Sequence, residues 1–423
     1  MEKKFFTKAK GIGGKIKRRY SDFIVEELAG NGKKCSAEFF LREENGKKGQ
    51  GETRGEMKIP EGRKDFLLLE MEKCNTETNL AVKTVARALH KSQKSIGYAG
   101  LKDKRAVTCQ RISVFMPSVK QLEKFSARGI VLRNPEWSDS GIDLGDLNGN
   151  YFTVKIRDIP LSGEEIKKRG DEAFGEMEKG IPNYFGEQRF GSIRQISHLV
   201  GREIIREDIK SAVMLYLTAI SELEEKEVKE ARLHLAESSN FKQAEREFPI
   251  KYRYERAMAH YLANNRKDFF GAFSILPRRL RFLFTHAYQS HLFNRLVEKR
   301  LGEGLFEPLE GEPQEDGIPM GLLPGYNSAF SPGRIGELER ELLEKEGITF
   351  ADFKLEKMKE CSCQGARRKI FFFPREMKLL EIGEDEFFEG KRKCKVSFYL
   401  DKGCYATVLL SELMKPGKEG TET

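Results

Sequence analysis

The chain is organised around a short basic loop that begins with two glycines three residues apart and runs into a strand, Gly97-Tyr98-Ala99-Gly100-Leu101-Lys102-Asp103-Lys104-Arg105-Ala106-Val107-Thr108-Cys109-Gln110. Asp103 is its only carboxylate, and Lys102, Lys104 and Arg105 flank it. Residues 112–115 alternate in polarity and predict a strand that anchors the loop on a sheet. Nearby positive charge favours the ionised form of a carboxylate, which suits a nucleophile, a base or a phosphate-site accessory. Lys-Asp-Lys also occurs in solvated turns, and local composition alone favours that alternative.

The bulk composition predicts a polar, multidomain protein with a polyanionic partner. At 423 residues the chain exceeds what one core usually serves, so two or three domains are expected. The net charge of +9 and the aromatic content favour nucleic acid, although a merely soluble protein from a salty or hot environment would share the basic balance. No apolar run approaches the roughly 20 residues that span a bilayer. Residues 1–20 carry eight Lys or Arg and lack an apolar core, so we expect no secretory signal and a cytoplasmic protein.

The cysteines and the loop motifs argue against a metal or a nucleotide cofactor. The seven cysteines include no Cys-x-x-Cys pair, and the six histidines are scattered, so reduced thiols without a metal site are expected. Neither a GxxxxGK[ST] loop nor a dinucleotide-binding fingerprint on a strand is present. We therefore expect a reaction that needs no cofactor.

Strand patterns gather at the two ends of the chain and helical patterns in its middle. Residues 151–157 alternate cleanly and predict a strand after a turn at Asn148-Gly149-Asn150, and Phe23 and Val25 share one face of another. Asn75-Thr76 predicts the cap of a helix through Ser92. Residues 222–237 indicate a solvated helix, and residues 277–301 a long amphipathic one flanked by arginines. Residues 42–64, rich in Gly, Glu and Lys, predict a mobile loop. The pattern favours a sheet domain interrupted by an inserted domain.

A second dense cluster is the run Pro182-Asn183-Tyr184-Phe185-Gly186-Glu187-Gln188-Arg189-Phe190-Gly191. Its aromatic rings and amides suit stacking on and hydrogen bonding to a splayed base. An aromatic plug in the protein core explains the composition equally well.

Taken together, these segments resemble the tRNA pseudouridine synthase D (TruD) family, in its archaeal form. The likeness rests on the Lys-containing entry to Asp22-Phe23-Ile24-Val25, the Gly97–Gln110 loop, the Asn183-to-Gly191 run, Ala287-Tyr288-Gln289-Ser290 and Gly403-Cys404-Tyr405-Ala406-Thr407. Each is only suggestive, but their ordered combination over most of the chain is specific.

The resemblance implies an α/β (α+β) fold. Its pseudouridine-synthase catalytic domain, with a mixed, largely antiparallel sheet, would comprise residues 1–192 and 375–423, interrupted by a family-specific α/β insertion (TRUD) domain at residues 193–374. It also implies the reaction, isomerisation of uridine to pseudouridine at position thirteen of the tRNA D-arm. A cofactor, a metal and a protein partner are not implied, and a monomer is expected.

The resemblance also assigns roles to individual residues. Asp103 matches the catalytic aspartate, either as an attacking group or as a base that removes a ribose proton. Lys17 matches the active-site lysine, with Lys102 as the local competitor, and we favour Lys17 because neighbours on a strand point to opposite faces. The substrate-binding positions match four side chains, Phe23, Asn183, Phe185 and Tyr405. The basic N-terminus and the arginines of residues 277–301 would hold tRNA phosphates.

Two rival functions remain from the sequence. A catalytically silent RNA-binding or chaperone protein of the same fold would keep the RNA-binding surface, but intact Asp103, Asn183 and Phe185 argue against it. A glycoside-cleaving enzyme would need a second acid near Asp103, and the loop offers none.

Overall fold

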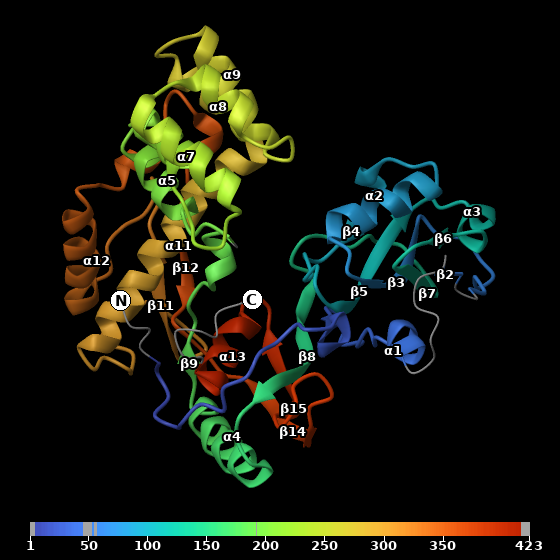
Figure 1. Cartoon of the computed structure of the whole chain (residues 1–423). Helices are drawn as coiled ribbons and strands as arrows, with labels where there is room; N and C mark the ends of the chain where they lie inside the picture. The colour runs from blue at the N-terminus through green and yellow to red at the C-terminus, as the bar shows by residue number, and fades with distance from the viewer. Residues whose placement is uncertain (1–4, 45–52, 55–56, 192, 416–423) are drawn as a thin grey trace. The chain divides into compact units, whose positions relative to one another are not determined.

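The computed structural model describes residues 5–44, 53–54, 57–191 and 193–415. The chain divides into two compact units (Figure 1): Met1–Ile181 together with Phe372–Thr423, and Pro182–Phe371. From the sequence we expected the transitions at 192/193 and 374/375. In the structure they lie at 181/182 and 371/372, so residues 182–191 belong to the second unit and residues 372–374 to the first. Of the loop expected at residues 42–64, positions 45–52 and 55–56 lie outside the described residues, and the rest includes the end of helix α1 (Phe39–Glu44) and strand β2 (Thr53–Arg54).

The first unit is built on a mixed sheet that is largely antiparallel, which confirms the expected fold class. Over the described residues the sheet has ten strands in the order β14-β15-β8-β1-β5-β3-β7-β6-β2, with β4 beside β5. Their bounds are β1 (Phe23–Ala29), β2 (Thr53–Arg54), β3 (Phe66–Cys74), β4 (Ile96–Tyr98), β5 (Val107–Phe115), β6 (Ser126–Ala127), β7 (Ile130–Ser138), β8 (Leu147–Ile159), β14 (Arg375–Glu384) and β15 (Arg392–Asp401). Strands β1 and β5 run parallel, whereas the other described pairs are antiparallel.

Alternation along the strands separates the cores on the two sides of this sheet. Phe23 and Val25 of β1 join Phe152 and Val154 of β8 in one buried cluster, which helices α4 (Gly163–Met177) and α13 (Ala406–Met414) complete. Ile24, between them in sequence, belongs to a different cluster. This is the period of two that a strand imposes, and it confirms the faces predicted for Phe23 and Val25.

Two local predictions in this unit are wrong. Asn148-Gly149-Asn150 is not a turn but part of β8, which pairs with β1 on one side and β15 on the other. Helix α2 spans Thr78–Ala88 with Glu77 as its N-cap residue, so Asn75-Thr76 does not cap it and it ends before Ser92. In β8 the pairing with two neighbouring strands overrides the turn composition, and at α2 the Thr76 hydroxyl donates to the carbonyl of Cys74 at 2.9 Å instead of capping the helix.

The second unit is mainly helical, and its longest helix, α11 (Arg278–Gly302), confirms the helix predicted at residues 277–301. Figure 1 shows α11 beside α5 (Ser197–Ile205), and the two pack closely. The remaining helices are α6 (Ile209–Thr218), α7 (Lys226–Ser238), α8 (Phe241–Glu247), α9 (Arg253–Asn264), α10 (Phe269–Ser274) and α12 (Gly333–Glu346). A small antiparallel sheet of β10 (Gln314–Glu315), β11 (Ile318–Leu323) and β12 (Ala366–Lys369) packs on α11. Short strands β9 (Ile181–Pro182) and β13 (Phe371–Phe372) pair where the chain passes between units.

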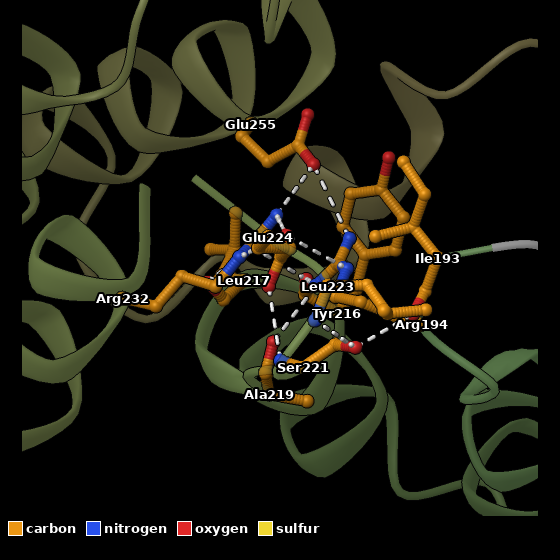
Figure 2. Close-up of polar contacts among 10 residues, drawn as sticks. All are labelled: Ile193, Arg194, Tyr216, Leu217, Ala219, Ser221, Leu223, Glu224, Arg232 and Glu255. Carbon is orange, nitrogen blue, oxygen red and sulfur yellow. Dashed lines mark hydrogen bonds and ion pairs between the residues drawn. The ribbon is translucent and has the colours of Figure 1, made fainter. Parts of the chain in front are cut away.

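A buried ionic network lies inside the helical unit, where the sequence predicted only a solvated helix face. Arg232 of α7 is fully buried, and its guanidinium donates to carboxylates of Glu224 and Glu255 at 3.1 Å each. Arg194 reaches the same two carboxylates (Figure 2). The prediction of a solvated face at residues 222–237 is therefore wrong for Glu224 and Arg232. Across the described residues, no helix has the length and apolar character of a membrane span.

Candidate active site

The topology of the sheet brings three separate segments to one edge. Strands β1 and β5 are parallel neighbours, with Ile24 opposite Val107, so the residues that precede each strand meet at the same edge. Asp103 lies just before β5. Strand β3 runs antiparallel to β5, with Cys74 opposite Val107, so the carboxyl end of β3 reaches that edge as well. The site is therefore assembled from chain positions that are far apart in sequence.

The Asp103 loop is fixed by hydrogen bonds to its main chain. The Thr78 hydroxyl, in the first turn of α2, accepts from the amide of Lys102 at 3.0 Å and donates to its carbonyl at 3.3 Å. The Gln110 amide, on β5, donates to the carbonyl of Gly100 at 2.9 Å. The Asp103 side chain itself stays partly open, with 29% of its surface exposed. The result is a rigid loop that presents one accessible carboxylate.

Lys17 is the ion-pair partner of this carboxylate. Its Nζ lies 2.9 Å from Oδ1 of Asp103, and the lysine side chain is only 6% exposed. The ammonium also lies 4.3 Å from the centre of the Phe23 ring, a cation–π contact that offsets part of the cost of burying it. The Lys17 backbone has φ of 61°, in the left-handed region that non-glycine residues seldom adopt.

The segment that carries Lys17 is pinned on both sides, which explains how it holds this backbone conformation. Lys15 exchanges two main-chain hydrogen bonds with Arg157, at 2.7 and 2.8 Å. Arg157, fully buried on β8, makes a bidentate pair with Asp22 at 2.9 Å for both bonds. Asp22 in turn accepts from the amide of Arg19 at 2.8 Å. Buried charge-assisted bonds of this kind fix geometry, and here they aim Lys17 at Asp103.

Lys102, the alternative partner considered from the sequence, is engaged elsewhere. Its Nζ lies 2.5 Å from a carboxylate oxygen of Glu27, and both side chains are buried. The other oxygen of Glu27 accepts from the amide of Arg111 at 3.1 Å. Lys102 therefore anchors the loop to β1, while Lys17 faces Asp103. The choice between the two lysines depends on the β1–β5 pairing, which the local sequence does not encode.

Lys73, on β3, is a further member of the cluster that sequence reasoning missed. It is fully buried, and its Nζ donates to the main-chain carbonyl of Asp103 at 2.8 Å. Burial lowers the pKa of Lys73 from 10.5 to about 8, against the opposing effect of Asp103. The available signal was a lysine that follows the apolar run Phe66-Leu67-Leu68-Leu69 by a few residues, at the end of the same strand.

The proposed substrate residues of the first unit differ in their accessibility. Phe23 is 1% exposed and packs edge-on against Phe152 with ring centres 6.1 Å apart, so in this structure it is a core residue beneath Lys17. Tyr405 is half-buried and occupies the N-cap position of α13, directly before the helix.

Asn183 and Phe185 belong to the second unit, where Arg368 of β12 links them. The guanidinium of Arg368 lies over the Phe185 ring at 4.3 Å and donates to Oδ1 of Asn183 at 2.5 Å. The main chain of Phe185 is held by Asn294 on α11, which accepts from its amide at 2.8 Å and donates to its carbonyl at 3.0 Å. Phe185 is half-buried, whereas Phe190 packs against histidines as a core plug. The core-plug interpretation is therefore right for Phe190, and base stacking by Phe185 stays a prediction.

Comparison with known proteins identifies the family. The family model for tRNA pseudouridine synthase D (TruD) matches residues 2–314 and 313–413. A probable tRNA pseudouridine synthase D from Methanococcoides burtonii is 34% identical over 97% of this chain and 95% of its own length. Another from Methanopyrus kandleri is 37% identical over 85% of this chain and 87% of its own. The crystal structure of a putative tRNA pseudouridine synthase D from Methanosarcina mazei is similar with a TM-score of 0.76 and 31% identity, covering 98% of this chain and 96% of that one.

These matches extend over nearly the whole chain and agree with the sheet topology described above. The chain belongs to the tRNA pseudouridine synthase D family. The family prediction made from the sequence is confirmed.

Proposed function

We propose that this protein isomerises uridine at position thirteen of the tRNA D-arm to pseudouridine, with Asp103 as the catalytic group and Lys17 as its charged partner. Membership of the family makes the chain a tRNA pseudouridine synthase, an isomerase, rather than a silent RNA-binding protein. The observation that supports the assignment of Asp103 is its ion pair with Lys17 on a rigid, partly open loop.

The chemistry suits a site of this composition. The reaction breaks the bond between ribose C1′ and uracil N1, rotates the base, and forms a bond between C1′ and C5. The proton on C5 is released and N1 takes up a proton. Atoms and electrons balance within the substrate, so no oxidant, reductant or nucleotide takes part. The reaction needs a group that attacks carbon or removes a ribose proton, and the Asp103 carboxylate, paired with the Lys17 ammonium at 2.9 Å, is a group of this kind.

The substrate would be held by aromatic stacking and by phosphate contacts. A flipped uridine loses its stacking in the tRNA, and the half-buried ring of Phe185, braced by Arg368, offers a replacement surface. Asn183 and Tyr405 complete the proposed contacts, and Phe23, the fourth residue assigned from the sequence, would act from beneath Lys17 by supporting its ammonium. Of the arginines and lysines proposed for phosphates on α11, Arg281, Arg295, Lys299 and Arg300 are ion-paired with glutamates. The exposed Arg278 and Arg279 make no ion pair with any described residue and suit that role best.

We further propose that the first unit is the catalytic domain and the second the insertion domain. A cytoplasmic location and a monomeric state remain predictions. No group of three or more metal-binding side chains occurs among the residues that the structure describes.

The proposed function is tested by mapping modified positions on a transcript. We expect the purified protein, incubated without any cofactor with unmodified tRNA, to produce pseudouridine at position thirteen, detected by carbodiimide labelling and primer extension. A transcript with cytidine at that position should remain unlabelled. Pseudouridine found only at other positions would contradict the assignment of position thirteen. The absence of pseudouridine from every tRNA tested would contradict the synthase activity.

The role of Phe185 predicts a loss of activity when its ring is removed. Stacking of one base contributes about 1–3 kcal/mol, so Phe185→Leu should lower kcat/KM roughly 10- to 100-fold. Phe270→Leu, the same change at a 41% exposed ring on α10 of the same unit, should leave kcat/KM within about twofold. Equal values for the two variants would rule out stacking by Phe185.

A further inference from the structure

Three buried lysines lie at the active-site edge, and Lys17 and Lys102 pair with carboxylates, whereas Lys73 contacts no side-chain carboxylate among the described residues. It lies at the penultimate position of β3, paired with Thr108 of β5, and is 0% exposed. Its Nζ donates to the main-chain carbonyl of Asp103 at 2.8 Å and lies 3.5 Å from that of Lys102. A buried ammonium without a direct carboxylate partner costs stability, which suggests a function other than folding.

The hydrogen bond from Lys73 fixes the main-chain carbonyl of Asp103, which is close in the covalent structure to the Asp103 side chain. Two bonds separate this carbonyl oxygen from the Cα that bears the side chain, so its position sets where the carboxylate lies. The Thr78 hydroxyl bonds to the amide and the carbonyl of Lys102, the residue before Asp103. Lys17 donates to the carboxylate of Asp103. Without the ammonium, the carbonyl of Asp103 would become a desolvated acceptor and the loop would shift.

We propose that Lys73 is a positioning residue for the isomerase reaction, holding the main chain of Asp103 so that its carboxylate stays against Lys17 and the reacting ribose. The inference rests on the proposed catalytic role of Asp103. Because Lys73 is buried, it does not touch RNA, and its effect should fall on kcat and not on tRNA affinity. Small displacements of a reacting group cost on the order of 100-fold in rate, which sets the expected scale.

The protonation of Lys73 gives the proposal a pH dependence that rate measurements can detect. The groups around it are Asp103, Cys74 and Glu77, which favour its charged form, and Lys102, which opposes it together with burial. With a pKa of about 8, Lys73 is charged at neutral pH and loses its proton as pH rises through 8. A neutral amine makes a weaker hydrogen bond than an ammonium, so the support for Asp103 should weaken over the same range.

Single-turnover rates of pseudouridine formation from pH 6 to 10 test the proposal, with Lys73→Met, Lys73→Arg and wild type compared on one tRNA transcript. We expect Lys73→Met to react roughly 10- to 100-fold more slowly at neutral pH, with its tRNA Kd within about twofold of wild type. Lys73→Arg keeps its charge at alkaline pH, so it should retain more activity than Lys73→Met and lack the decline near pH 8. Ionisation of uracil at N3 is common to all variants and cancels in the comparison.

The controls separate this inference from the assignment of Asp103. Lys83→Met, the same substitution on the exposed face of α2, should match wild type in rate and pH profile. Thermal melting verifies folding, and if Lys73→Met does not fold, the profile of Lys73→Arg against wild type decides. Wild-type rates for Lys73→Met, or superimposable profiles for Lys73→Arg and wild type, would overturn the role of Lys73 while Asp103→Asn stays inactive. Activity in Asp103→Asn would instead overturn the catalytic role of Asp103, on which this inference rests.

Discussion

Replacing Asp103 with asparagine is expected to lower the rate of pseudouridine formation by roughly 10⁴-fold or more, the scale seen when a reacting group is removed. Asparagine keeps the size of the side chain and the loop conformation, but it has no ionised oxygen to attack carbon or accept a proton. Binding of tRNA should change by less than about threefold, because phosphate contacts dominate RNA affinity and Asp103 makes none. Label release from uracil-tritiated tRNA measures the rate, and filter binding measures Kd.

The matched control for this variant is Asp139→Asn. Asp139 is 82% exposed in the same unit and pairs with Lys64 at 2.6 Å, so the same substitution there breaks an ion pair without touching the loop. We expect it to retain wild-type activity. Asp103→Asn also leaves the ammonium of Lys17 buried beside a neutral amide, so its melting temperature should fall even though the fold persists. Turnover within tenfold of wild type in folded Asp103→Asn would exclude Asp103 as the catalyst.

Asp103 shows how far reasoning from the sequence reached and where it stopped. Locally, the loop was indistinguishable from a solvated turn, and only the ordered resemblance to a family marked its carboxylate. The cation beside it was undecided, since Lys102 is adjacent in sequence and Lys17 is 86 residues away. The parallel pairing of β1 with β5 turns Lys17 towards Asp103 and leaves Lys102 to Glu27. Pairings between distant strands are not encoded in the local pattern of either strand.

The misread segment in β8 has the same cause. Asn-Gly-Asn is typical of a turn, yet Gly149 lies in a strand between β1 and β15. A Cβ built there would lie 2.3 Å from the carbonyl oxygen of Leu400 and 2.4 Å from the hydroxyl of Tyr399. The glycine is needed for close approach of a neighbouring strand and not for a turn. By contrast, the alternation of residues 151–157 was decisive, because burial on one face depends only on the period of the strand.

The second large effect is expected in the helical unit, where Glu255→Ala should destabilise the fold by about 3–5 kcal/mol. One carboxylate oxygen of Glu255 accepts from Arg232 at 3.1 Å and from Arg194 at 3.3 Å, as Figure 2 shows. Removing it leaves two guanidiniums that repel each other and share Glu224 alone. Burial already lowers the pKa of Arg194, and Arg232 lowers it further, which indicates how poorly a second buried cation is tolerated.

Glu255 also gives the network its contact with a further helix, because among the residues drawn in Figure 2 only Glu255 belongs to α9. Glu255 comes from α9, Arg232 from α7, and Arg194 from the segment before α5. Both guanidiniums donate to the last carbonyls of α6: Arg194 to Tyr216 at 2.7 Å and Arg232 to Leu217 at 2.8 Å. Loss of Glu255 therefore removes a charge that holds α7, α9 and the segment before α5 around the end of α6, and the cost should be cooperative.

Denaturant unfolding followed by two probes measures this effect and assigns it to one unit. The only tryptophan, Trp137, lies on β7 of the first unit, so its fluorescence reports that unit, whereas far-ultraviolet circular dichroism is dominated by the helices of the second. Glu255→Ala should shift the dichroism midpoint strongly and the fluorescence midpoint little. Glu230→Ala breaks a 52% exposed pair with Lys226 on α7 and should cost only about 0.5 kcal/mol. An equal loss of unfolding free energy in the two variants would contradict the prediction. It would show that the buried carboxylate of Glu255 contributes no more to stability than the exposed one of Glu230.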